Sequence, residues 1–198
     1  MSTTIVLATG NAGKVKEIQS ILAPLGYTIT PQTQYNVSEA DETGLTFIEN
    51  ALIKARNAAE QTGKPALADD SGLAVNALGG APGIYSSRYA GQQATDQQNN
   101  EKLLRDLHGI SDRSAFFYCA LALVRHATDP TPLICLGRWD GEILEQSAGT
   151  NGFGYDPLFY VPQKKCTSAE LKAEEKNRIS HRGIALQQLI SQIGTLKI

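Results

Sequence analysis

The sequence predicts an α/β protein with a mixed β-sheet and flanking helices. Three observations support this prediction. Apolar residues recur at helical spacing near both ends of the chain, short apolar runs typical of buried strands lie between them, and the middle has β-hairpin character. Helices that come first and last around such a middle favour a mixed sheet over a purely parallel one.

The chain begins with an expected strand over residues 5–7, which passes at once into a helix. Apolar residues at helical spacing define that helix: Val15, Ile18, Leu22 and Leu25. Gly26 is the expected stop. A second strand should cover residues 27–30 and close at Pro31, and the polar, acidic segment 32–44 should be a loop.

A second helix is predicted by the capping box Thr46-x-x-Glu49. Its apolar stripe consists of Phe47, Ala51, Ala55, Ala58 and Ala59. The polar residues Glu49, Lys54, Asn57 and Glu60 should face away from the sheet. Residues 66–68 are expected to form a short strand that ends in Asp69-Asp70-Ser71-Gly72.

The second half of the chain reads as loop, helix and β-rich runs. Residues 79–83 are dense in glycine and proline, but apolar patterning resumes on both sides, so they predict a loop and not a domain linker. Thr95-x-x-Gln98 should begin a third helix. The runs 116–125 and 132–139 are typical of strands, and Asp140-Gly141 predicts a hairpin turn after the second run.

Three further elements are expected near the end of the chain. They are a strand over residues 157–161, a short helix capped by Thr167-x-x-Glu170, and an amphipathic helix over residues 184–193. We find no internal repeat.

The length of 198 residues suits one α/β domain, so we expect a single domain over residues 1–198. The formal net charge of −2 gives no electrostatic footprint for nucleic acid. No apolar run approaches the roughly 18 residues that span a bilayer, and no signal-peptide pattern is seen. Cys119, Cys135 and Cys166 fit neither a zinc spacing nor a disulfide framework. We therefore expect a cytoplasmic protein with neither nucleic acid nor membrane as a partner.

A candidate phosphate-binding loop joins the first strand to the first helix. Its residues are Thr9, Gly10, Asn11, Ala12, Gly13 and Lys14. Glycines let a backbone approach a ligand closely, and a helix N-terminus offers N–H donors and partial positive charge. The spacing matches neither a Walker A loop nor a G-x-G-x-x-G loop, and Val15 replaces the Walker A hydroxyl. An ordinary turn with a solvated lysine is the alternative.

Asp69 and Asp70 follow an apolar run, at the kind of position where α/β proteins collect ligands. Adjacent strand residues point to opposite faces, so one carboxylate can face a site while the other supports it. Such a carboxylate can hold magnesium or accept a proton from an attacking water; an Asp-Ser-Gly turn is the alternative. In the acidic run Glu39, Asp41 and Glu42, a solvated loop accounts for two residues, and one could reach a metal.

Two further segments could recognise a base. Phe153, Gly154, Tyr155 and Asp156 place aromatic rings and a carboxylate at a glycine-rich turn, which suits stacking on a base or, alternatively, a core aromatic pair. Lys176 and Ser180-His181-Arg182 lie at an expected helix start and offer donors for an anion or a ring carbonyl. A structural histidine is the alternative there.

Together these motifs resemble the non-canonical purine nucleoside triphosphate pyrophosphatases, also called inosine triphosphate pyrophosphatases, and among them the bacterial dITP/XTP enzymes. The resemblance covers nearly the whole chain. Its motifs are Thr9-Gly10-Asn11-x-x-Lys14, Glu42-Thr43-Gly44, Phe47-x-Glu49-Asn50-Ala51, Ala68-Asp69-Asp70-Ser71-Gly72-Leu73, Gly79-Gly80-Ala81-Pro82-Gly83, Phe153-Gly154-Tyr155-Asp156 and Ser180-His181-Arg182.

The resemblance implies a homodimer whose protomer has two lobes around a central substrate cleft. It implies hydrolysis of ITP, dITP and XTP to the monophosphate and diphosphate with Mg²⁺. Residues 9–14 would hold the triphosphate, Asp70 would be the proton acceptor and a metal ligand, and Glu42 would be a second ligand. The substrate contacts it implies elsewhere are Ser71, Phe153, Gly154, Tyr155, Asp156, Lys176, His181 and Arg182.

Two other functions remain open from the sequence. One is a nucleotide pyrophosphatase with a different base preference, as in the Maf-like proteins. The other is a nucleotide-binding sensor without turnover. The acidic pair argues against the sensor, because carboxylates beside a polyanion weaken binding unless a metal intervenes.

Overall fold

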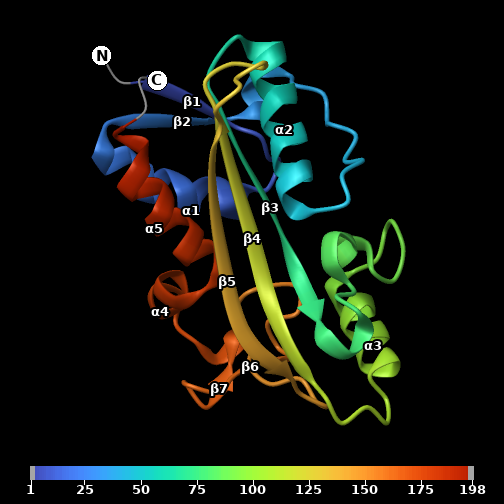
Figure 1. The fold of residues 1–198 in the computed structure, drawn as a ribbon. Helices are drawn as coiled ribbons and strands as arrows, with labels where there is room; N and C mark the ends of the chain where they lie inside the picture. The colour runs from blue at the N-terminus through green and yellow to red at the C-terminus, as the bar shows by residue number, and fades with distance from the viewer. Residues whose placement is uncertain (1–2, 196–198) are drawn as a thin grey trace. The chain divides into compact units, whose positions relative to one another are not determined.

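The computed structural model describes residues 3–195. Its seven strands form one sheet in the order β2-β1-β3-β4-β5-β6-β7 (Figure 1). The strands are β1 (Thr3–Leu7), β2 (Tyr27–Pro31), β3 (Ala66–Val75), β4 (Ser114–Val124), β5 (Leu133–Ile143), β6 (Phe159–Val161) and β7 (Cys166–Thr167). β1 pairs in parallel with β2 and β3, whereas β6 pairs antiparallel with β5 and β7. The prediction of a mixed sheet is confirmed.

Five α-helices accompany the sheet within residues 3–195. They are α1 (Ala12–Leu22), α2 (Phe47–Thr62), α3 (Asp96–Asp106), α4 (Ala173–Ile179) and α5 (His181–Ile193). Capping boxes at Thr46 and Thr95 begin α2 and α3 as the sequence predicts, and the box at Thr167 begins a single 3-10 turn. α5 begins three residues before the amphipathic stretch predicted at Ile184. No described helix is long and apolar enough to cross a membrane.

The chain divides into two compact units that share strands. Unit 1 takes in Met1–Asp70, Ala120–Leu136 and Ala185–Ile198, as far as the described residues extend. Unit 2 takes in Ser71–Cys119 and Gly137–Ile184. β3, β4 and β5 each begin in one unit and end in the other, so both units are built on the same three strands.

In unit 1, α2 packs on one face of the strands, and α1 and α5 lie on the other (Figure 1). The α2 face of the sheet carries small apolar side chains that pack with the alanine stripe predicted for the helix. The buried members of this cluster are Val6, Ala8, Ala51, Ala55, Ala58, Ala59, Ala66, Ala68, Ala120, Ala122 and Val124. Their small volume lets the helix axis approach the strands closely.

Unit 2 has a larger, aromatic core. Phe117 lies at its centre, with ring centroids 4.6 Å from Phe159 and 6.4 Å from Trp139. Leu73 and Leu103 bring β3 and α3 into the same cluster. The second half of β3 therefore belongs to a different core from the first half.

β3 does not end at Asp69 as predicted. The strand runs on through Asp70, Ser71 and Gly72 to Val75, and only Asp70 and Ser71 along it are half-buried. The four-residue motif has turn chemistry, but the apolar alternation resumes after it and supplies side chains to the unit 2 core. The two carboxylates therefore lie in the middle of a strand.

The hairpin turn predicted at Asp140-Gly141 is also wrong. Both residues lie inside β5. A Cβ on Gly141 would lie 2.5 Å from the Tyr160 carbonyl oxygen and 2.6 Å from the Phe159 ring. The glycine is therefore needed for the close approach of β6 and not for a turn.

Candidate active site

Alternation along β3 sends its two carboxylates in opposite directions. Asp69 shares a face with Leu67, and Asp70 shares a face with the alanines that pack under α2. Asp69 accordingly pairs with Lys14 of α1, whereas Asp70 pairs with Lys54 of α2. The two side chains therefore point to opposite faces, as the sequence predicts for adjacent strand residues.

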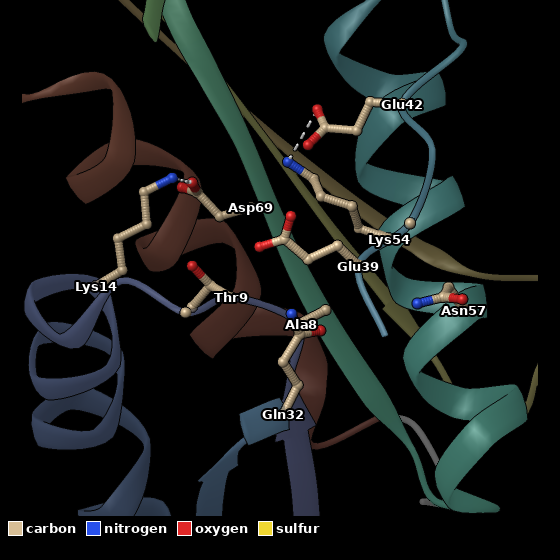
Figure 2. Close-up of a pocket in the computed structure, with 11 residues that line it drawn as sticks. Ala8, Thr9, Lys14, Gln32, Glu39, Glu42, Lys54, Asn57 and Asp69 are labelled. Atoms are coloured by element: carbon tan, nitrogen blue, oxygen red, sulfur yellow. Dashed lines mark hydrogen bonds and ion pairs between the residues drawn. The ribbon is translucent and has the colours of Figure 1, made fainter. Parts of the chain in front are cut away.

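The Lys14–Asp69 pair lies on the α1 side of β3 (Figure 2). The Asp69 side chain is completely buried, and that of Lys14 is 18% exposed. The first turn of α1 holds the lysine, because Asn11 caps the helix and accepts from the backbone N–H groups of Gly13 and Lys14 at 2.9 and 3.1 Å. Asp69 therefore holds the Lys14 ammonium in an ion pair.

The second charged group lies on the α2 side. The Lys54 ammonium is 2.7 Å from Asp70 Oδ1 and 3.5 Å from Glu42 Oε2. Burial tends to lower the pKa of Lys54, but the negative charges of Asp70, Glu42 and Asp69 outweigh it and raise the pKa above its usual 10.5. Lys54 is therefore a cation at neutral pH.

Asp70 differs from an ordinary ion-paired aspartate. Burial raises its pKa above the usual 3.8, Lys54 opposes that rise, and the like charges of Glu42 and Asp69 add to it. Its Oδ2 atom is buried and has no hydrogen-bond partner among the described residues. A buried carboxylate oxygen without a donor is costly unless something else binds it.

The loop that carries Glu42 is tied to α2 at two points. Gly44 N–H donates to Asn50 Oδ1 at 2.8 Å. Ser38 exchanges two hydrogen bonds with Gln61, from its N–H at 3.0 Å and to its hydroxyl oxygen at 2.9 Å. The helix thus anchors the acidic loop on both sides of Glu42.

These groups surround a pocket in unit 1 of about 180 Å³. It is lined by Ala8, Thr9, Gly10, Lys14, Gln32, Glu39, Ala40, Glu42, Lys54, Asn57 and Asp69 (Figure 2). The lining contains two lysines and three carboxylates, and Asp70 beside Lys54 adds a fourth carboxylate. A polyphosphate would meet an excess of negative charge here unless a cation accompanied it.

A divalent cation fits this donor set. Mg²⁺ takes oxygen ligands and is usually held by one or two carboxylates together with water and substrate phosphates. The unpaired Asp70 Oδ2 and the nearby Glu42 carboxylate supply that number of groups. Among residues 3–195 no cluster of three or more metal-ligating side chains occurs.

The candidate phosphate-binding loop, residues 9–14, meets the pocket with only part of its length. Thr9, Gly10 and Lys14 line the pocket, but Asn11 occupies the N–H donors of Gly13 and Lys14 that were expected to cradle phosphate. Ala12 begins α1, and its side chain lies outside the described part of the structure. Thr9, Gly10 and Lys14 are therefore the residues of this loop that a ligand in the pocket could contact.

The remaining predicted site residues lie in unit 2. Asp156 is buried and accepts from Phe153 N–H at 2.9 Å, from Ser168 Oγ at 2.7 Å and from Lys176. Phe153 is 57% exposed, with the Lys176 ammonium 5.5 Å from its ring centroid. Tyr155 is a core residue whose hydroxyl donates to the Ser86 carbonyl, so the aromatic pair has one exposed and one buried member.

His181 and Arg182 begin α5 and are both buried. The His181 ring stacks on Phe117, with centroids 4.8 Å apart and planes 13° apart. The Arg182 guanidinium donates to Ser71 Oγ at 3.1 Å. Since Ser71 follows Asp70 in β3, this bond connects the helix start to the residue next to the unit 1 carboxylate.

Sequence reasoning missed part of the pocket. Lys54 and Asn57 were expected to face away from the sheet, and they do leave the apolar stripe, but they line the pocket. Glu39 lines it together with Glu42, so two residues of the acidic run reach the site and not one. A polar helix face looks the same in sequence whether it meets water or an acidic loop, so only the fold reveals these residues.

The fold and the pocket define a class of protein. It is an α/β protein in which the parallel strand β1 ends at a pocket lined by lysines and carboxylates, a lining that suits a cation together with an anionic ligand. Comparison with known proteins then gives the family: the Ham1 family model matches residues 5–192. The chain belongs to the Ham1 family.

Individual relatives agree along the whole chain. A protein of Photobacterium profundum named dITP/XTP pyrophosphatase is 58% identical over 191 residues, covering 96% of this chain and 97% of the relative. One of Salmonella typhimurium with the same name is 59% identical with the same coverage. The solved structure of a HAM1 protein from Coxiella burnetii is 54% identical, with a TM-score of 0.95 over 98% of this chain and all of that one.

Proposed function

We propose that this protein hydrolyses non-canonical purine nucleoside triphosphates, namely ITP, dITP and XTP, to the nucleoside monophosphate and diphosphate. Relatives that carry this activity in their names align over nearly the full length. The observation that carries the proposal is the buried, unpaired Asp70 Oδ2 beside Lys54, which itself lines a pocket where carboxylates outnumber lysines. Such a site suits a metal-dependent reaction of a polyanion better than simple anion binding.

The reaction requires a water oxygen to bond to the α-phosphorus while the bond from that phosphorus to the bridging oxygen breaks. Asp70 orients the water and takes its proton, a role that its raised pKa favours. Lys14 and Lys54 stabilise the negative charge that develops on the departing diphosphate. Mg²⁺, held by Asp70 and Glu42, would neutralise further charge on the phosphates.

Base selection is assigned to residues of unit 2. The exposed Phe153 ring offers a stacking surface, and Lys176, His181 and Arg182 offer donors. Hypoxanthine and xanthine carry a carbonyl at position six, where adenine carries an amino donor. A site built to donate to that carbonyl leaves its own donors unpaired against adenine, which can discriminate by about 10⁴-fold.

The decisive experiment is a panel of nucleoside triphosphates with Mg²⁺, scored for diphosphate against single phosphate. We expect diphosphate from ITP, dITP and XTP, with much slower turnover of ATP and GTP. Equal rates on all purines, or a preference for pyrimidines, would favour the broader pyrophosphatase. Binding without any product would favour the sensor, and release of single phosphate would exclude the assigned scissile bond.

We also propose that the protein works as a cytoplasmic homodimer. The family resemblance implies the dimer, and the three cysteines, which are free thiols in the described structure, fit a reducing compartment. Light scattering after gel filtration would test the dimer through a mass twice that of the 21.3 kDa chain.

A further inference from the structure

We propose that Asp96 and Asn100 of α3 are positioning residues for base recognition, because together they fix the Gly154 peptide units and so hold the Phe153 ring ready for a purine. This inference rests on the proposed function, since it concerns the base-binding part of that site. Neither residue belongs to a motif singled out in the sequence. Both lie in unit 2, as does the turn that they contact.

The geometry is a two-point attachment of one residue to one helix. Gly154 N–H donates to Asp96 Oδ2 at 2.7 Å, and Asn100 Nδ2 donates to the Gly154 carbonyl at 2.9 Å. Asp96 and Asn100 are four residues apart and therefore share one face of α3. Both peptide units that flank the Gly154 Cα are thus oriented by the same rigid element.

The turn needs such an attachment because of its own sequence. Gly152 and Gly154 adopt φ values of +79° and +62°, a region that glycine enters easily, and glycine leaves the backbone unusually free. Asp156 restrains the first part of the turn through its bond from Phe153 N–H. The second part, after Phe153, is restrained by α3.

Phe153 itself gains little from core packing. Its side chain is 57% exposed, whereas Tyr155 two residues later is 4% exposed and anchored in the aromatic core. The backbone fixes the point from which an exposed ring extends and limits its rotamers, so a fixed Gly154 narrows the positions that the stacking surface can take. Holding a ligand-binding group in its bound geometry raises affinity by reducing the ordering cost of binding.

Asn100 has one further property that fits this role. Its amide is oriented by the bond that Nδ2 donates to Gly154, and its Oδ1 is buried without a hydrogen-bond partner among the described residues. Buried polar atoms are normally hydrogen-bonded, so an unsatisfied one calls for an explanation. Here the other end of the same amide is bonded to the turn that carries the aromatic ring.

The test compares a ligand that carries the base with one that lacks it. Asn100→Ala and Asp96→Ala are measured by calorimetry for binding of IMP and, separately, of inorganic diphosphate. Asp96→Asn is the conservative variant, because its side-chain oxygen can still accept from Gly154 N–H. Gln97→Ala is the matched control, since Gln97 lies in the same helical turn but bonds to Glu101.

We expect each alanine variant to bind IMP roughly tenfold more weakly, because the ring must then be ordered on binding. Binding of diphosphate should not change, Asp96→Asn should regain most of the IMP affinity, and Gln97→Ala should match the parent protein. With ITP as substrate, the KM should rise about tenfold while kcat changes little, since uniform binding is lost.

Two outcomes would overturn the inference. One is unchanged IMP binding in both alanine variants while Phe153→Ala loses it, which would leave the proposed function intact. The other is an equal loss for IMP and diphosphate, which would mean that α3 acts only through general stability. If Phe153→Ala itself binds IMP normally, the base site in the proposed function is wrong, and the two failures are thereby distinguished.

Discussion

Asp70 in unit 1 is half-buried and Asp156 in unit 2 is buried, and each carboxylate lies beside a lysine, yet their hydrogen bonding differs. Asp156 is saturated with three donors, from Phe153, Ser168 and Lys176. Asp70 has one oxygen paired with Lys54 and the other unsatisfied. The difference teaches that a saturated carboxylate determines the shape of a site, whereas an unsatisfied one is available for chemistry.

The largest expected effect comes from the unsatisfied carboxylate. Asp70→Asn should lower diphosphate release from ITP by roughly 10²–10⁴-fold, the usual contribution of a positioned proton acceptor, while the melting temperature stays close to that of the parent. Asp156→Ala is the contrasting variant. It should destabilise the protein by about 3 kcal/mol, because it leaves the half-buried Lys176 ammonium unpaired and the Phe153 N–H and Ser168 hydroxyl without their acceptor. If Asp70→Asn turned over normally, the contrast between the two carboxylates would fail.

The Lys14–Asp69 pair allows a structural role and a role in the reaction to be measured separately at one ion pair. Lys14→Ala should lose roughly 2–4 kcal/mol of transition-state stabilisation in kcat/KM, and also some stability, because Asp69 is left buried and charged. The double variant Lys14→Ala/Asp69→Ala should recover the stability but not the activity. Recovery of both would show that the lysine acts only through the fold.

A smaller effect is expected for base preference. Arg182→Ala removes a donor assigned to the purine carbonyl and should reduce the ITP-to-ATP ratio of kcat/KM by roughly tenfold, since one hydrogen bond that distinguishes the two bases is lost. His181→Phe keeps a ring that can stack on Phe117 but removes its nitrogens, and it is the matched comparison. A ratio unchanged in both variants would assign base reading to other residues.

The subtlest expected effect is on pH dependence. Asp70 must be ionised to accept a proton, and burial raises its pKa, so the acid limb of the rate profile should lie above the usual 3.8 of an aspartate. Lys54 opposes that rise. Lys54→Met should therefore move the acid limb to still higher pH, measured as kcat/KM at constant Mg²⁺. A limb that moved to lower pH would contradict the assigned pairing.

Much of the fold was predictable because it depends on local signals. The capping boxes at Thr46 and Thr95 and the stop at Gly26 are readable without tertiary information. The hairpin turn predicted at Asp140-Gly141 was wrong, because a glycine needed for close packing cannot be distinguished in the sequence from one needed for a turn. For the same reason the Asp69-Asp70-Ser71-Gly72 motif was predicted to end β3, although the strand continues through it.

The site was partly predictable for a related reason. Asp70 and Glu42 could be named from the resemblance, and their neighbours in space are consistent with the roles it implies. Lys54 could not be named, because its contacts join a helix, a loop and a strand that are separated along the chain. Asp96 and Asn100 could not be predicted, because they bond to backbone atoms of Gly154 and every residue has the same backbone groups.

The alanine stripe of α2 contains no polar side-chain atom, yet it affects the position of the Lys54 ammonium. Ala51, Ala55 and Ala58 are fully buried against the strands, and on the same helix the lysine reaches across to Asp70. These three methyl groups therefore help to set the distance between α2 and β3 that the Lys54 side chain must span. The position of the Lys54 ammonium therefore depends on the small residues between α2 and the sheet as well as on the length of its own side chain.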